Sequence, residues 1–229
     1  LNLDGGPAAN VPTDVCGSNI CLTSVAAANG NMSVDGAGQE LLDVRLSYGN
    51  GRQHARMAAP LPDGDSGAFG DIHAIELPPF SAGVAMTAGS DALQNGVTLS
   101  IPTGSAVKHD ITIYLDESER VFRSLVIDPS LYNLPAVDAG LGLEVLIATA
   151  PVDSTVCPAA TLTFPNAAGW AADAEVEIFM HGTKTFQHYA PWGGWDLVSE
   201  AVVASDGQTV STKPGEGIVM LGLFGARLK

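Results

Sequence analysis

Short runs of alternating apolar and polar residues recur along the chain, separated by turns rich in glycine, proline and asparagine. The clearest pair is residues 97–101 and 111–115, on either side of a Pro-Thr-Gly-Ser turn. Similar runs predict strands at 22–25, 41–48, 121–127, 142–148, 160–164, 175–180, 195–203, 209–211 and 218–224. No segment keeps a helical period for the roughly ten residues that a helix assignment needs. The pattern therefore predicts an all-β protein, an antiparallel β-sandwich or sandwiches with few or no helices.

The composition of successive segments predicts three parts. Residues 1–20 are rich in glycine, proline and asparagine without a periodic pattern, so we expect an irregular N-terminal arm. Residues 21–150 are expected to form a β-sandwich. Residues 151–229 are expected to form either a second β module or a continuation of the same sandwich.

Charge and hydrophobicity narrow the functional classes. The 229 residues include 10 Lys and Arg against 25 Asp and Glu, which gives a formal charge of −15. The basic residues form no run, so we expect no nucleic-acid partner. Hydrophobic residues make up 46% of the chain and charged residues 15%, which is enough apolar material for a folded core. No apolar stretch reaches the roughly 18 residues of a membrane helix, so no membrane-spanning segment is predicted.

The cysteines indicate the compartment. Cys16 and Cys21 flank a Gly-Ser-Asn turn, so a short hairpin disulfide between them is sterically reasonable. The alternatives are two small buried residues, or a bridge from Cys157 to one of the pair, and the spacing does not decide between them. Disulfides are typical of proteins outside the cell. The sequence starts at Leu1 without a leader, so we expect an extracellular or cell-surface protein whose signal peptide has been removed.

Two segments resemble modules of bacterial surface proteins. Residues 96–105 and 110–113 resemble the opening of the β-sandwich domain shared by ankyrins, netrin receptors and zonula occludens proteins, and 157–165 resembles its closing strand. The match spans roughly residues 90–166. Residues 192–210 are similar to a Trp/Asp-Gly module that often follows this domain in bacterial surface proteins. The resemblance implies packing and display on a surface. The His-Phe-Ser triplet at which some family members cleave themselves is absent, so that activity is not implied.

An acidic loop is the candidate cation site. Asp63, Asp65, Ser66 and Asp71 lie among glycines, and calcium binds hard oxygen ligands supplied by flexible turns. The acidic residue that would complete an EF-hand is missing, because position 74 is alanine. The alternative is a solvated turn that uses Asp and Gly for backbone reasons. The predicted cofactor is therefore calcium or none.

Aromatic residues concentrate near position 190. Tyr189, Trp192 and Trp195 form the densest aromatic group, and exposed aromatic rings bind sugars by stacking. The alternative is that these rings pack in the core. We list them as a candidate surface for a ligand or partner.

Catalytic patterns are weak. The nucleophile elbow Gly-x-Ser-x-Gly is absent, and the histidines show no metal-binding spacing. Glu175 and Glu177 share one face of a predicted strand, as expected for a solvated surface. No catalytic residues are predicted.

The sequence favours a secreted, non-catalytic structural or interaction protein, such as a cell-surface, sheath or filament subunit. Its expected partners are copies of itself or other surface proteins, and polysaccharide is a further candidate. One alternative is a carbohydrate-binding module using Trp192 and Trp195. The last is a calcium-dependent extracellular hydrolase. Because a charge of −15 opposes close packing of copies, we expect divalent cations to promote any assembly.

Overall fold

The computed structural model describes residues 1–17, 20–34, 40–44, 52–61, 70–111, 113–184 and 189–229. These residues form strands and four short 3₁₀ turns but no α-helix, which confirms the all-β prediction. The strands are β1 (Pro12–Cys16), β2 (Cys21–Val25), β3 (Leu41–Val44), β4 (Met57–Pro60), β5 (Val84–Ala85), β6 (Asp91–Gln94), β7 (Val97–Ser100), β8 (Ala106–Lys108), β9 (Val121–Ile127), β10 (Val145–Ala150), β11 (Thr155–Pro165), β12 (Glu175–His181), β13 (Trp195–Val203), β14 (Thr209–Thr212), β15 (Ile218–Met220) and β16 (Leu223–Leu228). The 3₁₀ turns are η1 (Phe80–Ala82), η2 (Glu117–Glu119), η3 (Pro129–Leu131) and η4 (Ala139–Leu141). Among the described residues, none of the helices has the length and apolar character needed to cross a bilayer.

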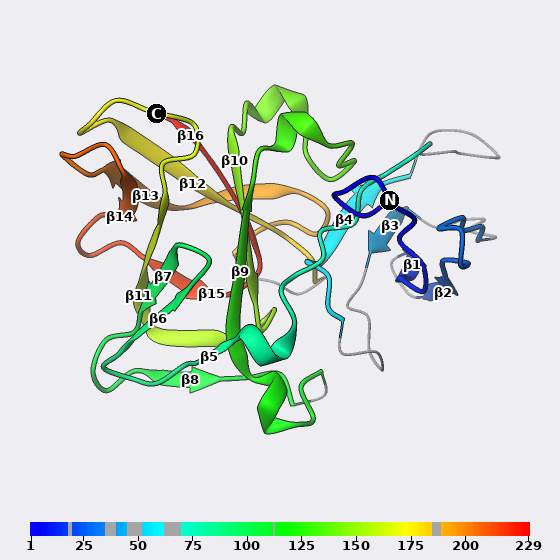
Figure 1. Cartoon of the computed structure of the whole chain (residues 1–229), viewed down its shortest axis with the longest axis horizontal. Helices are drawn as coiled ribbons and strands as arrows, with labels where there is room; N and C mark the ends of the chain where they lie inside the picture. The colour runs from blue at the N-terminus through cyan, green and yellow to red at the C-terminus, as the bar shows by residue number, and fades with distance from the viewer. Residues whose placement is uncertain (18–19, 35–39, 45–51, 62–69, 112, 185–188) are drawn as a thin grey trace.

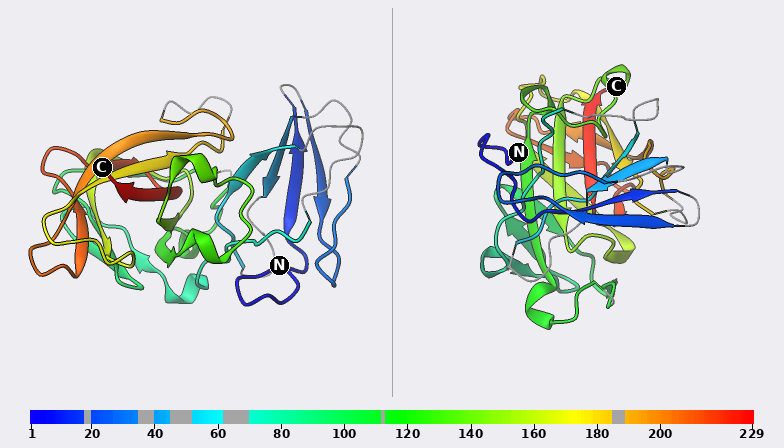
Figure 2. Two further views of the ribbon diagram at one scale, coloured as in Figure 1. Left: turned by 90° about the horizontal axis from the view of Figure 1, so that it is seen from above. Right: turned by 90° about the vertical axis from the view of Figure 1, so that its right-hand side faces the viewer.

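The N-terminal sheet has four antiparallel strands in the order β2-β1-β3-β4 and lies beside the rest of the chain (Figures 1 and 2). Residues 12–16 fall inside the segment predicted to be an irregular arm, yet they form the interior strand β1. The reason is tertiary: β1 pairs with β2 on one side and β3 on the other, and four of its five residues are buried. The disulfide Cys16–Cys21 joins directly opposed positions of β1 and β2.

The remaining strands form a nearly closed, barrel-like antiparallel sheet in the order β5-β9-β10-β16-β12-β13-β14-β11-β7-β6, with β8 and β15 paired to β11. The predicted sandwich of two facing sheets is therefore replaced by one sheet rolled on itself (Figure 1). Strands from both sides of residue 150 contribute to this sheet. β10, which ends at Ala150, pairs through Val145–Ala148 with the C-terminal strand β16, a partner that local patterning cannot reveal.

Strand β10 separates two cores, and this explains why all six of its residues are buried. Val145 and Ile147 point into the barrel core, together with Leu162, Ile178 and Phe224. The alternate residues Leu146, Ala148 and Ala150 belong to a second core with Met57 and Ala59 of β4. The second core fixes the N-terminal sheet against the outside of the barrel.

Two predicted strands differ from the observed ones. Residues 111–115 form no strand in their described part: the backbone N–H groups of Ile113 and Tyr114 donate to the carbonyl of Asp110 in a turn. Tyr114 is buried, whereas Ile111 and Leu115 are exposed. This turn therefore packs into the core through Tyr114 and not through the apolar face that the alternation predicted. Residues 218–224 are split into β15 and the start of β16. This split shapes the candidate site.

Candidate functional site

The barrel wall has a seam between β13 and β15. The long strand β11 pairs with β14 through residues 163–165 and with β15 through Thr155 and Ala160, so β14 and β15 follow one another along the same side of β11. β14 also pairs with residues 201–203 of β13. In the described part of the chain, β15 has no strand partner other than β11, and residues 195–200 of β13 have none other than β12. The two strands therefore face each other without a ladder.

A groove occupies this seam. Its volume is about 370 Å³, which lies in the range of small ligand sites. Most of its lining residues are of apolar type, and they are Met180, Tyr189, Asp196, Leu197, Val198, Gly217, Ile218, Val219, Met220 and Phe224. Leu197 is 45% exposed and Tyr189 is 40% exposed, so the groove presents apolar surface to solvent.

Local contacts define the ends and edges of the groove. The backbone N–H of Gly217 donates to Ser199 Oγ at 3.1 Å, and the N–H of Lys213 donates to the Glu200 carbonyl at 2.9 Å, which together close one end. On the β13 wall, the N–H of Leu197 donates to the Asp196 carboxylate at 2.9 Å. A side chain therefore satisfies this strand N–H.

A β-bulge aims the β13 wall into the groove. Ile178 is opposite Ser199, whereas the next residue, Phe179, is opposite Leu197, so Val198 is an extra residue in β13. Such a bulge bends the strand and redirects its side chains. Strand alternation predicted β13 itself, but neither the bulge nor the seam, because both depend on pairing with distant strands.

The free side of β2 is a second candidate surface. β2 is the terminal strand of the N-terminal sheet, and among the described residues its only strand partner is β1. Ile20 is 57% exposed and Val25 is 55% exposed. Ser24 Oγ donates to the Ser33 carbonyl at 3.3 Å, but no backbone hydrogen bond joins β2 to residues 31–34. Residues 15–34 carry no charged side chain.

The predicted aromatic surface is divided by the fold. Trp195 is partly buried, its indole N–H donates to the Ala136 carbonyl at 2.7 Å, and its ring lies 4.8 Å from that of His181. Trp192 is also partly buried. Tyr189, by contrast, lies at the groove. Of the two glycines between the tryptophans, Gly193 packs against the N-terminal sheet, since a Cβ at this position would lie 2.9 Å from Leu41 Cδ2.

His181 ties the barrel to the N-terminal sheet. Its Nε2 accepts a hydrogen bond from the backbone N–H of Ala58 in β4 at 2.9 Å, and its Nδ1 donates to the Gly194 carbonyl at 2.9 Å. Burial lowers the pKa of His181 to about 4. The imidazole is therefore neutral at physiological pH, with the proton on Nδ1.

Buried charges lie at the same junction. The Arg56 guanidinium bonds to both carboxylate oxygens of the fully buried Asp43 and lies 4.0 Å from Asp153, while Lys184 lies 3.1 Å from Asp153. Burial lowers the pKa of Arg56, but the hydrogen bond and charge of Asp43 outweigh it and raise the pKa overall. Sequence reasoning missed these residues because they come from distant segments without a motif.

The predicted calcium loop is mostly outside the described residues. Asp63, Asp65 and Ser66 all lie outside the described residues, so the calcium site stays a prediction. Asp71 is described and exposed, and its backbone carbonyl accepts a hydrogen bond from Asn133. Within the described ranges, the potential metal-ligand atoms that cluster belong to Asp14, Cys16 and Cys21. The two sulfur atoms are bonded to each other, so this group is not a ligand set.

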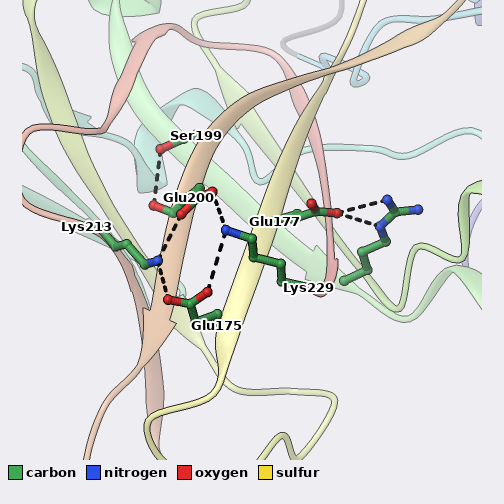
Figure 3. Close-up of polar contacts among 7 residues, drawn as sticks. Glu175, Glu177, Ser199, Glu200, Lys213 and Lys229 are labelled. Carbon is green, nitrogen blue, oxygen red and sulfur yellow. Dashed lines mark hydrogen bonds and ion pairs between the residues drawn. The ribbon is translucent and has the colours of Figure 1, made fainter.

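The carboxylates on the barrel surface are engaged by lysines (Figure 3). Lys213 and Lys229 each contact both Glu175 and Glu200, while Glu177 pairs with Arg227. The hydrogen bonds from Lys229 and Lys213 lower the pKa of Glu200 to about 2. Ion pairs that are this exposed form a solvated surface, and the pKa values of Glu175 and Glu200 are lowered, which is the opposite of the shift that a general acid requires.

Comparison with protein-family models, curated proteins and solved structures found no match to this chain.

Proposed function

We propose that this chain is a secreted, non-catalytic structural or interaction protein that self-associates through the free side of β2. The observation that carries the proposal is an exposed, uncharged edge strand on a strongly acidic chain. Alternate N–H and C=O groups of β2 point away from β1. An edge of this kind is a template for pairing with another strand.

Electrostatics favours a second copy as the partner. Two copies of a chain with a charge of −15 repel each other over most orientations. The uncharged residues 15–34 surround β2, so repulsion is least where two β2 strands meet. Antiparallel pairing of β2 with itself is self-complementary and gives a closed two-fold dimer. It would join two four-stranded sheets into one of eight strands.

Other observations support the extracellular and surface parts of the proposal. The disulfide between Cys16 and Cys21 is consistent with an oxidising compartment. The resemblance of residues 90–166 to modules of bacterial surface proteins favours display on a cell surface, sheath or filament. Divalent cations would strengthen association by neutralising the acidic surfaces of the two copies, and the acidic loop that contains Asp71 is the proposed site.

A pair of lysine substitutions tests the proposal. Thr23→Lys with Val25→Lys puts like charges along the edge while leaving β2 solvated, as natural edge strands do. Sedimentation equilibrium over about a hundredfold range of concentration should show dimers for the wild type and monomers for the variant. The matched control is Leu93→Lys, which changes an equally exposed apolar residue (59%) in β6 of the barrel. A variant that dimerises as the wild type and the control do would refute the proposal.

A further inference from the structure

The seam between β13 and β15 has the properties of a peptide site, and it is independent of the β2 edge. Residues 195–200 and β15 lie on opposite sides of the groove, and each is hydrogen-bonded to a strand on one side only within the described chain. An extended peptide supplies alternating donors and acceptors for both walls at once. We propose that this groove binds an extended peptide with apolar side chains at alternate positions and basic residues at its ends.

The lining matches apolar side chains. Met180 and Met220 contribute flexible thioethers that adapt to irregular shapes, and Phe224 is a fully buried part of the lining. Leu197 and Tyr189 lie at the exposed side. Because successive side chains of a strand point in opposite directions, alternate residues of the bound segment enter the groove while the others face solvent.

Charge selects the flanking residues. Asp196 is exposed in the groove lining, and the exposed Glu216 precedes the lining residue Gly217. The nearest lysine in sequence, Lys213, is already held by Glu175 and Glu200. The rim is therefore acidic, on a chain that is acidic overall, which disfavours acidic peptides and attracts basic ends.

The test uses a capped heptapeptide of alternating threonine and leucine with lysine at both ends. Binding is measured by titration calorimetry, and amide hydrogen exchange locates the site. We expect saturable binding, with slowed exchange at Val219 in β15. Leu197→Glu should weaken binding by about tenfold or more, since it removes an apolar contact and adds repulsion at the groove. Leu93→Glu, at an exposed apolar residue of β6, should bind as the wild type does.

Three further probes distinguish other occupants. A peptide of the same sequence with N-methylated threonines loses the backbone donors that face one of the two walls, so binding as tight as that of the unmethylated peptide would overturn strand addition. A glutamate-flanked peptide should bind more weakly, and equal binding would refute the charge argument. No peptide binding, or binding of a soluble β-glucan oligosaccharide without peptide binding, would overturn the proposal altogether. Because Leu197→Glu leaves β2 untouched, dimerisation of that variant separates this test from that of the proposed function.

Discussion

Gln94 closes the barrel onto Ser124 through side-chain hydrogen bonds. Gln94 Oε1 accepts from the Ser124 backbone N–H at 2.7 Å, and Ser124 Oγ donates to the Gln94 carbonyl at 2.6 Å. Both residues are buried, and Asn95 adds a bond to the Ser124 carbonyl at 3.0 Å. These contacts join β6 to β9, the place where the strand order has no regular ladder. Side chains thus satisfy the strand edges at the closure, whereas in the described part of the chain the β13/β15 seam has such a link at one end, from the Gly217 N–H to Ser199 Oγ.

Gln94→Ala should destabilise the barrel. The substitution leaves the buried N–H of Ser124 without its acceptor, and an unsatisfied buried donor costs about 1–3 kcal/mol. Urea denaturation measures this loss in the free energy of unfolding. Gln208→Ala is the control, because Gln208 is an exposed turn residue, and it should change stability little. Equal stability of the two variants would show that the closure does not depend on Gln94.

The free energy of unfolding should fall as the pH drops from 6.5 toward 4. His54 and His181 are buried, and burial lowers the pKa of each from 6.5 to about 4. In this window the unfolded chain binds protons that the folded chain excludes, so stability is complete above pH 6.5 and is lost on acidification. Arg56, which faces His181, and Arg52, near His54, also disfavour the charged imidazoles, while Glu76 partly offsets this at His54.

The free energy of unfolding should fall by up to about 1.4 kcal/mol per pH unit for each histidine. Denaturation of the wild type and of His54→Leu at a series of pH values measures it. The variant should keep the contribution of His181 and lose that of His54. If the free energies of unfolding of the two proteins differed by the same amount at every pH, His54 would not contribute to the pH dependence.

Removing the disulfide should loosen the N-terminal sheet alone. Cys16→Ser with Cys21→Ser opens a short loop, whose closure contributes roughly 2 kcal/mol. Hydrogen exchange should accelerate in β1 and β2 and stay slow in β10 and β16, because the bridge lies within one sheet. Cys157→Ser, at the exposed free cysteine, is the control. Uniform acceleration in the barrel would mean that the sheet and the barrel unfold as one unit.

Gly182→Ala should disrupt the junction between barrel and sheet. A Cβ at this position would lie 2.0 Å from the Pro191 carbonyl oxygen, so the backbone must shift. We expect a loss of about 1–3 kcal/mol, as for other overpacked sites. Gly215→Ala is the comparison: its φ of +86° adds strain, but no atom lies within 4 Å. If Gly182→Ala lowered the free energy of unfolding by less than Gly215→Ala does, the close approach of Gly182 to the Pro191 carbonyl would be contradicted.

The sequence alone predicts where many of the strands lie but little of how they pair and pack over long distances. Alternation located β7, β9 and β13, and the apolar run at 142–148 indicated β10. Closure of the barrel depends on Gln94 and Ser124, which are polar, 30 residues apart and without a motif. The same holds for His181, whose partner Ala58 is 123 residues away. Of the candidate site, Tyr189 was anticipated as a surface residue, but the groove arises from a split at 221–222 that a continuous apolar run conceals.

Amide hydrogen exchange of β2 as a function of protein concentration tests the central claim most directly. If two copies pair through this edge, the outward N–H groups of Cys21–Val25 should become protected as concentration rises, while exchange in the barrel stays constant. The protection should disappear in the Thr23→Lys, Val25→Lys variant. Exchange of β2 that is fast and independent of concentration would contradict self-association through this strand.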